Sequence, residues 1–431
     1  MKAWLASLAV YRDRRMLAIL FMGFGSGLPL ALTGYTLSVW LAEAKVSLTA
    51  IGLFAFVGIA YTLKFLWAPL LDRPLPWLTR RLGRRRSWGL VIQLLLAVAI
   101  FAMGVTDPAA QPAATAALAA LVAFLSASQD IVVDAFRVEL LADDEQGAGA
   151  AVTQVGYRLA MIASTAGALY LATFFGWFAT YSAMAAGIVV GMAALLSMRE
   201  PATVASRAAP GAGWVRLLVL EPLLDFLGRL GPRRAIAILV FVMLYKLGDA
   251  MAGHMSGPFY LSLGFTKIEI ANITKMFGVG ASILGIVAGG SVVYRLGIMR
   301  ALLVCGLLQM SANLLYIVQA KAGHDLGMLT ATIGLENFAG GMGSAAFVAY
   351  LSSLCNVAFT ATQYALLSSL ATVGRTTLSA SGGWLSDHLD WVAFFSVTTV
   401  AAVPGILMVL WLMRKFPLRM PIARPALAVD D

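Results

Sequence analysis

Apolar stretches of about twenty residues recur along almost the whole chain, from Met16 to Arg414. A helix that crosses the hydrocarbon core of a bilayer needs roughly 20 mostly apolar residues, and a helix satisfies its own backbone polar groups in lipid. The pattern therefore predicts an all-α integral membrane protein with twelve transmembrane helices. We place these helices at residues 16–41, 50–71, 87–106, 114–138, 147–174, 177–198, 235–263, 270–294, 299–320, 326–354, 361–385 and 391–413.

A weak internal repeat relates the first six predicted spans to the last six. Gln146 precedes one span and Arg158 lies twelve residues further on, and Gln363 and Arg375 repeat this spacing 217 residues later. Two such halves, related by an axis along the membrane normal, are typical of the major facilitator fold. The predicted units are an N-terminal six-helix bundle at 1–198, a cytoplasmic linker at 199–234, and a C-terminal six-helix bundle with a short cytoplasmic tail at 235–431.

Composition supports a membrane protein, because 60% of the residues are hydrophobic and only 12% are charged, whereas soluble domains have about 45–50% and 25%. The net charge of +10 is concentrated on one side of the predicted spans. The segments on the side of the termini hold 22 Lys and Arg residues, and the opposite loops hold only Lys45, Lys267 and Lys321. The positive-inside rule therefore predicts that both termini are cytoplasmic. The positive net charge is therefore explained by membrane topology and by contact of the basic side with anionic lipid. This explanation argues against nucleic-acid binding.

Cysteine and histidine are too sparse to predict a metal site, a cofactor or an enzyme. The cysteines are Cys305 and Cys355, and the three histidines are far apart in the sequence. No nucleophile constellation or phosphate-binding loop is present. The first apolar run is too long for a cleavable signal peptide, and we interpret it as the first span.

Ionisable residues inside the predicted spans indicate a polar interior. The interiors of spans 3, 6, 9 and 12 contain none, so we expect these helices to face lipid. A charge within the membrane is expensive and points to function. The other spans carry nine charges: Lys64, Asp130, Asp134, Arg158, Lys246, Asp249, Lys275, Glu336 and Arg375.

Position along the helices indicates how these charges could act. Asp130 and Arg158 each lie 14 residues from Asp144, so we expect them to face each other at a similar depth. A membrane-embedded carboxyl whose proton affinity depends on its neighbours could couple transport to protons. The candidates for this role are Asp130, Asp249 and Glu336. The alternative is that the charges only pair to hold helices together, which applies most to Asp134 and Arg137.

Other residues are candidates for contacts to a substrate or between helices. Cationic side chains could bind carboxylates, amides could bind polar groups, and aromatic rings could stack on a sugar or simply pack. The substrate-binding candidates are Lys64, Gln129, Arg158, Lys246, Asn337, Gln363, Arg375, Tyr61, Tyr157 and Tyr245. The candidates for inter-helix or gating contacts are Asp134, Arg137, Asp72, Arg73 and Arg84.

Several segments resemble the AmpG family of muropeptide permeases. After Asp72-Arg73, the run from Gly83 to Arg86 resembles a stretched form of the facilitator loop signature between spans 2 and 3. The more specific segments are GFGSGLPL (23–30), LKFLWAPLLDR (63–73), SASQDIVVDAF (126–136), GAGAAVTQVGYRLAM (147–161), LYKLGDA (244–250), ENFAGGMG (336–343) and ATQYALLSSLATVGR (361–375). The resemblance covers roughly residues 16–413.

The resemblance implies a specific activity. AmpG-type permeases lie in the inner membrane of Gram-negative bacteria and import N-acetylglucosaminyl-1,6-anhydromuramic acid and its peptide-bearing forms from the periplasm. Import depends on the proton motive force, serves peptidoglycan recycling and, in some species, signals β-lactamase induction. The family's motifs map onto Gln129 and Asp130, onto Lys246 and Asp249, and onto Glu336 and Asn337. Some members carry two further C-terminal spans, which we do not expect the core transport fold to need.

Two other classes of function stay open from the sequence. The related acetyl-CoA transporters keep another cargo possible, such as acetyl-CoA or a small peptide. An integral-membrane enzyme acting on lipid-linked sugars would instead release a new product in detergent. We expect a transporter that binds muropeptide, protons and membrane lipid, works as a monomer and holds no cofactor.

Overall fold

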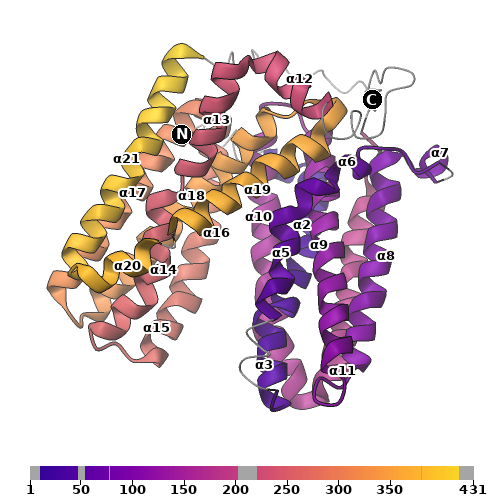
Figure 1. Cartoon of the computed structure of the whole chain (residues 1–431), viewed down its shortest axis with the longest axis horizontal. Helices are drawn as coiled ribbons and strands as arrows, with labels where there is room; N and C mark the ends of the chain where they lie inside the picture. Colours follow the sequence, from indigo (N-terminus) through magenta and orange to yellow (C-terminus); the bar gives the residue numbers. More distant parts are fainter. Residues whose placement is uncertain (1–9, 47–53, 77, 202–220, 380, 417–431) are drawn as a thin grey trace.

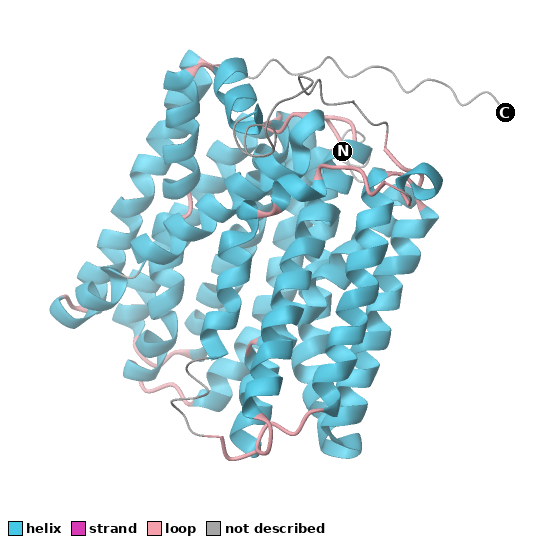
Figure 2. Ribbon diagram, turned by 45° about the vertical axis from the view of Figure 1, so that its right-hand side comes forward, coloured by secondary structure: helices cyan, strands magenta, loops and turns pink. Residues whose placement is uncertain are grey.

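The computed structural model describes residues 10–46, 54–76, 78–201, 221–379 and 381–416. Across these ranges every regular element is a helix and no strand occurs (Figures 1 and 2). Eight helices in them are long and apolar enough to cross a membrane, or nine if the bent pair at 326–353 and 357–375 forms one span. The predicted all-α membrane class is therefore confirmed, and the number of twelve spans stays a prediction.

The first half of the chain forms one group of helices, shown in indigo to magenta in Figure 1. Asp13 begins the first long helix, because its side chain accepts a hydrogen bond from the Arg15 backbone N–H and caps the helix. Gly176 has φ +76, which glycine adopts without strain, and the chain turns there within α11. The described α-helices of this half are α2 (Arg14–Thr33), α3 (Tyr35–Glu43), α5 (Ile59–Leu63), α6 (Ala68–Leu71), α7 (Thr79–Leu82), α8 (Arg84–Val105), α9 (Pro112–Leu140), α10 (Gln146–Ile162) and α11 (Ala168–Ser197).

The second half forms another group of helices, shown in rose to yellow in Figure 1. It begins with the short helix α12 and ends with α21, and several of its spans are broken or bent rather than straight. The elements are α12 (Glu221–Leu230), α13 (Pro232–Leu244), α14 (Leu247–Ser262), α15 (Lys267–Ile273), α16 (Val279–Leu296), α17 (Ile298–Ala322), α18 (Leu326–Ser353), α19 (Thr360–Ser379), α20 (Ser381–His388) and α21 (Trp391–Lys415).

Glycines allow two helix pairs to pack with their backbones nearly touching. A Cβ atom on Gly156 of α10 would overlap the Leu20 carbonyl oxygen of α2, and one on Gly285 of α16 would overlap the Phe338 carbonyl oxygen of α18. Small residues permit this close approach, which replaces the hydrophobic driving force that lipid does not supply. Each half is therefore held internally by a tight pair, α2 with α10 and α16 with α18.

The two halves contact each other near the end at which the two termini lie (Figure 1). A hydrophobic cluster there joins Leu71 and Ile131 of the first half to Ala361 and Ala365 of the second. At the opposite ends of the helices, each hydrophobic cluster contains residues of one half only. One cluster includes Trp40 and Tyr181 of the first half, and another includes Tyr316 and Phe395 of the second. Among the described residues, the halves are thus closed against each other on the terminus side.

Candidate functional site

The first half contributes a carboxylate and a cation from two different spans. Ser26 of α2 donates a hydrogen bond of 2.5 Å to the Asp130 carboxylate of α9. Lys64 is 8% exposed and lies where α5 passes into the short 3₁₀ helix Lys64–Leu66. Its ammonium group interacts electrostatically with Asp130, as does the Asp134 carboxylate one turn further along α9. The break in the second span therefore brings a buried cation to the predicted carboxylate.

The second half places Lys246 at a comparable break between α13 and α14. The Lys246 Nζ atom donates hydrogen bonds to Ser344 Oγ at 2.7 Å and to the Gly340 carbonyl at 3.3 Å, both on α18. The same ammonium group lies 3.6 Å from Asp249 Oδ2. Gln309 Nε2 of α17 donates to that carboxylate at 3.2 Å. Lys246 and Asp249 thus form a pair, as their spacing predicts, held by two neighbouring helices.

Electrostatic interactions between the halves link these two sets. The Arg158 guanidinium of α10 interacts electrostatically with the Glu336 carboxyl of α18 and with the Lys246 ammonium group. Arg375 of α19 interacts with Lys246. Asn337 Nδ2 donates a hydrogen bond of 3.0 Å to Glu336. We call the seven charges Lys64, Asp130, Arg158, Lys246, Asp249, Glu336 and Arg375 the interface charge cluster.

Asp130 and Arg158 interact with different partners, so the structure does not pair them with each other as their depth along the helices predicts. Asp130 interacts with Ser26, Lys64 and Asp134, whereas Arg158 interacts with Glu336 across the interface. The aromatic candidates Tyr61 and Tyr157 lie near Asp130. The Lys275 and His254 side chains are outside the described part of the structure.

Gln129 does not face the interface charge cluster, although the sequence makes it a substrate-binding candidate. Its side chain is fully buried within the first half, and neither amide atom has a hydrogen-bond partner among the described residues. The Gln129 amide lies against Gly25, and Gly25 in turn contacts Gly191. The Gln93 amide lies on the other glycine, Gly191; it is also fully buried and has no hydrogen-bond partner among the described residues. The Gln129 side chain is thus packed among the helices of the first half, and its contact with a substrate stays a prediction.

Tyr245 and Gln363, two further substrate-binding candidates, form contacts between helices in this structure. The Tyr245 ring stacks on Phe347 with centroids 5.4 Å apart, and its hydroxyl donates to the Leu302 carbonyl at 2.8 Å. Both atoms of the Gln363 amide are occupied near α12, where Nε2 donates to Asp225 at 2.8 Å and Oε1 accepts from the Asn356 backbone at 2.7 Å. These buried, satisfied groups hold helices together.

The terminus-side contact between the halves centres on Asp72, which follows α6. Its carboxylate accepts hydrogen bonds from the Ala361 and Thr362 backbone N–H groups at 3.2 and 3.0 Å, and from Thr362 Oγ1 at 2.6 Å. These N–H groups are in the first turn of α19, where a helix has unsatisfied donors and a partial positive charge. Asp72 of the first half therefore caps a helix of the second half.

An ion-pair network behind Asp72 fixes this carboxylate within the first half. The fully buried Arg85 guanidinium contacts Asp72 at 2.7 Å and also pairs with Glu139 at the end of α9. Arg84 pairs with Glu139 at 3.0 Å and donates to the Asp72 carbonyl. Arg73 lies at this end of the span, and its carbonyl accepts from Trp88. The Asp72 carboxylate, which contacts the other half, is thus oriented by Arg85, and Arg85 is itself held by the buried Glu139 carboxylate.

Arg137 forms a second part of the terminus-side contact. Its guanidinium is fully buried and donates to Ser352 Oγ of α18 at 3.0 Å and to Gln146 Oε1 at 3.4 Å. It also lies 5.7 Å from the centre of the Tyr364 ring of α19. Asp134 is 3.5 Å away on the same helix. Arg137 therefore joins α9 to two helices of the other half, in addition to the predicted pairing with Asp134.

Comparisons with known proteins agree with this architecture. The chain is 42% identical over 405 residues to the anhydromuropeptide permease of Escherichia coli (strain K12), a match that covers 94% of this chain and 80% of the relative. It is 35% identical over 411 residues to the putative transporter AmpG 4 of Rickettsia conorii, covering 94% and 98% of the two chains. The chain belongs to the AmpG family of transporters. A family model described as acetyl-coenzyme A transporter 1 matches residues 15–174.

Solved structures show which fold this AmpG-family chain adopts. A bacterial homologue of the iron transporter ferroportin, in an outward-facing state, matches with a TM-score of 0.67 at 15% identity over 93% of this chain and 99% of that one. A proton:xylose symporter of the major facilitator superfamily matches with a TM-score of 0.62 at 14% identity over 96% of both chains. The predicted major facilitator fold is thereby confirmed, and the chain is a multi-pass membrane transporter.

Three residues of the AmpG-family site were missed by reasoning from the sequence. Arg85 and Glu139 form the ion-pair network behind Asp72. The sequence signal for this network is the acidic Glu139 at the end of one span, on the same side of the membrane as the run of arginines from Arg84 to Arg86. Gln309 lies on a span expected to face lipid, yet it binds Asp249. A lone glutamine in an apolar span is the available signal, because an unpaired amide is costly in lipid.

Proposed function

We propose that this AmpG-family chain is a proton-coupled secondary transporter that imports anhydromuropeptides from the periplasm to the cytoplasm by alternating access. The observation that carries this proposal is the interface charge cluster, to which both halves contribute cations and carboxylates. Intramembrane charges of this kind mark substrate and ion pathways. The identity to an anhydromuropeptide permease supports the choice of cargo.

The orientation follows from charge asymmetry, because the terminus side carries most of the Lys and Arg residues and is therefore cytoplasmic. The contact around Asp72 and Arg137 then closes the cytoplasmic side. This arrangement corresponds to an outward-facing state, in agreement with the likeness to an outward-facing transporter. We place the protein in the bacterial inner membrane as a monomer with two bundles, 1–198 and 235–431, joined by the linker 199–234.

An anhydromuropeptide offers peptide carboxylates, amides and sugar hydroxyls to such a site. Arginine forms planar, bidentate hydrogen bonds with carboxylates, whereas lysine acts as a point charge. Arg158 and Arg375 therefore suit the carboxylates of the stem peptide, with Lys64 and Lys246 adding positive charge. Asn337 suits an amide or hydroxyl, and the rings of Tyr61 and Tyr157 suit the sugar faces.

Proton coupling would use Asp130, Asp249 and Glu336. Each carboxyl has a cationic neighbour in this state: Lys64 beside Asp130, Lys246 beside Asp249, and Arg158 near Glu336. The proton affinity of a carboxyl depends on its charged neighbours. A substrate carboxylate that takes Arg158 as its partner would displace Glu336, so substrate binding and proton binding at Glu336 would be linked.

Uptake of labelled anhydromuropeptide into sealed, energised right-side-out vesicles tests the proposal. We expect accumulation that collapses when a protonophore removes the proton gradient. Accumulation that survives the protonophore would exclude proton coupling, and the absence of uptake by folded protein would exclude this cargo.

A second cargo, acetyl-CoA, is favoured by the family model that matches residues 15–174. Acetyl-CoA carries several phosphates, which would require clustered cations in the substrate site. Competition between unlabelled acetyl-CoA and labelled muropeptide distinguishes the two cargoes. Muropeptide uptake that resists a large excess of acetyl-CoA supports the first cargo, and strong inhibition supports the second.

A further inference from the structure

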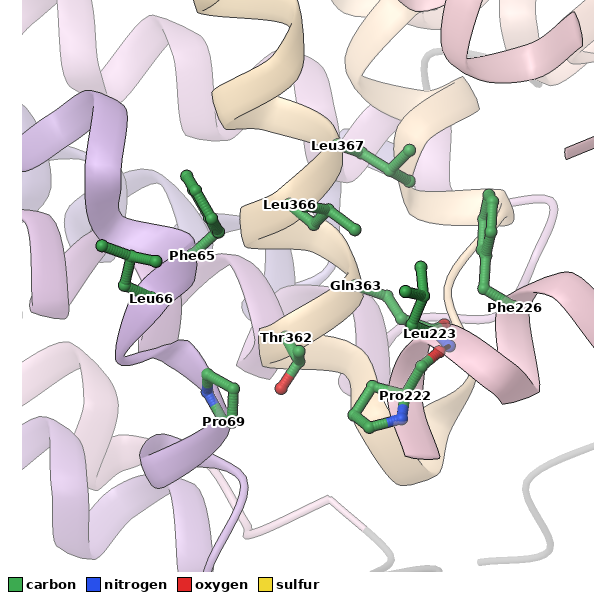
Figure 3. A pocket seen from close by; sticks show the side chains of 10 residues that line it. All are labelled: Phe65, Leu66, Pro69, Pro222, Leu223, Phe226, Thr362, Gln363, Leu366 and Leu367. Atoms are coloured by element: carbon green, nitrogen blue, oxygen red, sulfur yellow. Dashed lines mark hydrogen bonds between the residues drawn. The ribbon is translucent and has the colours of Figure 1, made fainter. Parts of the chain in front are cut away.

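An apolar groove lies outside the interface charge cluster, where α12 and α19 of the second half lie beside the second span of the first half. Its volume is about 190 Å³. Figure 3 shows its wall formed by Phe65, Leu66 and Pro69 of the second span, by Leu223 and Phe226 of α12, and by Leu366 of α19. An apolar cavity of about 150 Å³ is enough to bind a small hydrocarbon and stays free of water. This groove is therefore suited to several methylene groups.

The surroundings of the groove indicate that its occupant comes from the bilayer. Leu66 is 61% exposed and Leu70, one turn further on, is 51% exposed, so this face of the span presents large apolar side chains outward. Leu224, beside the groove on α12, is 57% exposed. In a membrane-spanning chain such a surface faces lipid. A hydrocarbon chain can reach the groove along this outward-facing apolar surface.

The basic surroundings of the groove favour a negatively charged headgroup. The two carboxylates that bind the lining residues Thr362 and Gln363 are themselves occupied, because Asp72 binds Arg85 and the start of α19, and Asp225 binds Arg229, Gln363 and Asn356. Arg73 lies four residues beyond Pro69 at the cytoplasmic end of the span. The terminus side as a whole carries 22 Lys and Arg residues. Such basic membrane surfaces attract anionic lipid.

We propose that this groove holds one acyl chain of an anionic glycerophospholipid of the cytoplasmic leaflet. The assignment of the leaflet rests on the orientation in the proposed function. The walls come from the second span in the first half and from α12 and α19 in the second half, so the bound chain contacts three elements drawn from both halves. This is a defined site, in contrast to the lipid that covers the open faces of outer helices such as α8.

Photolabelling of the full chain in lipid nanodiscs tests this site without a transport assay, so its outcome is independent of the cargo. The probe is phosphatidylglycerol with a diazirine on its acyl chain, present at a low mole fraction among zwitterionic lipids. We expect roughly fivefold more label on the groove peptides, about 1 kcal/mol of preference, than on the α8 peptide that contains Leu94 and Val98. Equal labelling of the two regions would overturn the proposal.

A matched pair of variants makes the test specific. Leu223→Trp fills the groove from α12 and should lower groove labelling to the level of α8. Leu94→Trp makes the same change on α8, where the side chain is 57% exposed, and should leave groove labelling unchanged. If Leu223→Trp does not fold, Leu366→Trp fills the groove from α19. Unchanged labelling in a folded filled variant would refute the site.

Two further arms test the headgroup and the occupant. Phosphatidylethanolamine with the same diazirine chain should label the groove less than phosphatidylglycerol at equal mole fraction. Equal labelling by both would overturn the anionic preference. A crosslink of the groove peptides to a second copy of the chain in place of lipid would assign the groove to an oligomer contact and overturn the proposal.

Discussion

Loss of the Asp72 carboxylate should open the terminus side of the transporter, which is the cytoplasmic side in the proposed orientation. Asp72 makes three hydrogen bonds to the first turn of α19, and these bonds exist only while the two halves are closed against each other there. Its ion pair with Arg85 lies within the first half and persists when the halves separate. Asp72→Ala therefore penalises the closed state selectively.

The magnitude follows from the two roles of the carboxylate at α19. A side chain that caps a helix N-terminus contributes about 1 kcal/mol, and its negative charge near the helix dipole adds about 0.3–1 kcal/mol. A loss of about 1.3–2 kcal/mol shifts the equilibrium roughly 10- to 30-fold towards the state that is open on the terminus side. Asp72→Asn retains an oxygen that can cap and loses only the charge, so we expect a shift of roughly two- to fivefold.

The chain contains its own reporter for this shift. Cys355 is partly buried directly after α18, beside the terminus-side contact, and Cys305 is fully buried in the core. In a Cys305→Ser background, a membrane-impermeant maleimide reacts with Cys355 in inside-out vesicles as the cytoplasmic side opens. The rate of modification should rise roughly 10- to 30-fold for Asp72→Ala.

Glu139→Gln provides the control. Glu139 binds Arg84 and Arg85 in the same network and forms no hydrogen bond or ion pair with the other half among the described residues. We expect it to lower thermal stability while changing the Cys355 rate much less than Asp72→Ala. If Asp72→Ala leaves the rate unchanged, or if Glu139→Gln accelerates it equally, then the cap on α19 does not hold the closed state.

The remaining predictions concern coupling, buried amides and packing. Asp130→Asn should abolish accumulation against a gradient but keep exchange of substrate between equal pools, and accumulation by the well-expressed variant would refute the coupling role. Gln93→Leu should leave the melting temperature unchanged or raise it, because the buried Gln93 amide has no hydrogen-bond partner in the described part of the chain. Gln309→Leu should lower uptake, because it removes a hydrogen bond to Asp249. Gly285→Ala should destabilise the protein by several kcal/mol, because the added Cβ would overlap the Phe338 carbonyl oxygen. The control is Gly280→Ala, whose Cβ would meet no described atom and which should leave the thermal unfolding temperature unchanged.

Reasoning from the sequence succeeded where the signal is local. The spans follow from runs of apolar residues, and the family follows from contiguous motifs such as ENFAGGMG. The pairing of Lys246 with Asp249 was also predictable, because residues at i and i+3 share one helix face. These properties depend only on neighbouring residues, so the rest of the fold does not change them.

Partners across helices could not be predicted in the same way. Depth along a span places Asp130 and Arg158 at one level, but it says nothing about the direction in which each side chain points around its helix. Arg158 turns towards Glu336 because α10 lies against the second half as well as against α2. Adjacent residues such as Gln129 and Asp130 differ by about 100° around a helix, so they face different surroundings. A motif that contains both could not show which one faces the interface.

The repeated pair, Gln146 with Arg158 and Gln363 with Arg375, has the same two roles in both halves: the glutamine fixes the start of its helix, and the arginine belongs to the interface charge cluster. Each glutamine lies at the start of its helix and binds backbone carbonyls, Gln146 those of Val138 and Leu141, and Gln363 that of Pro222. Each arginine lies twelve residues further on, about 18 Å along a helix that rises 1.5 Å per residue, in the interface charge cluster. A helix of this length moves largely as a unit. A change in the cytoplasmic contact at the start of α19 is therefore expected to displace Arg375 as well, which links the closure around Asp72 to the charges that would meet the substrate.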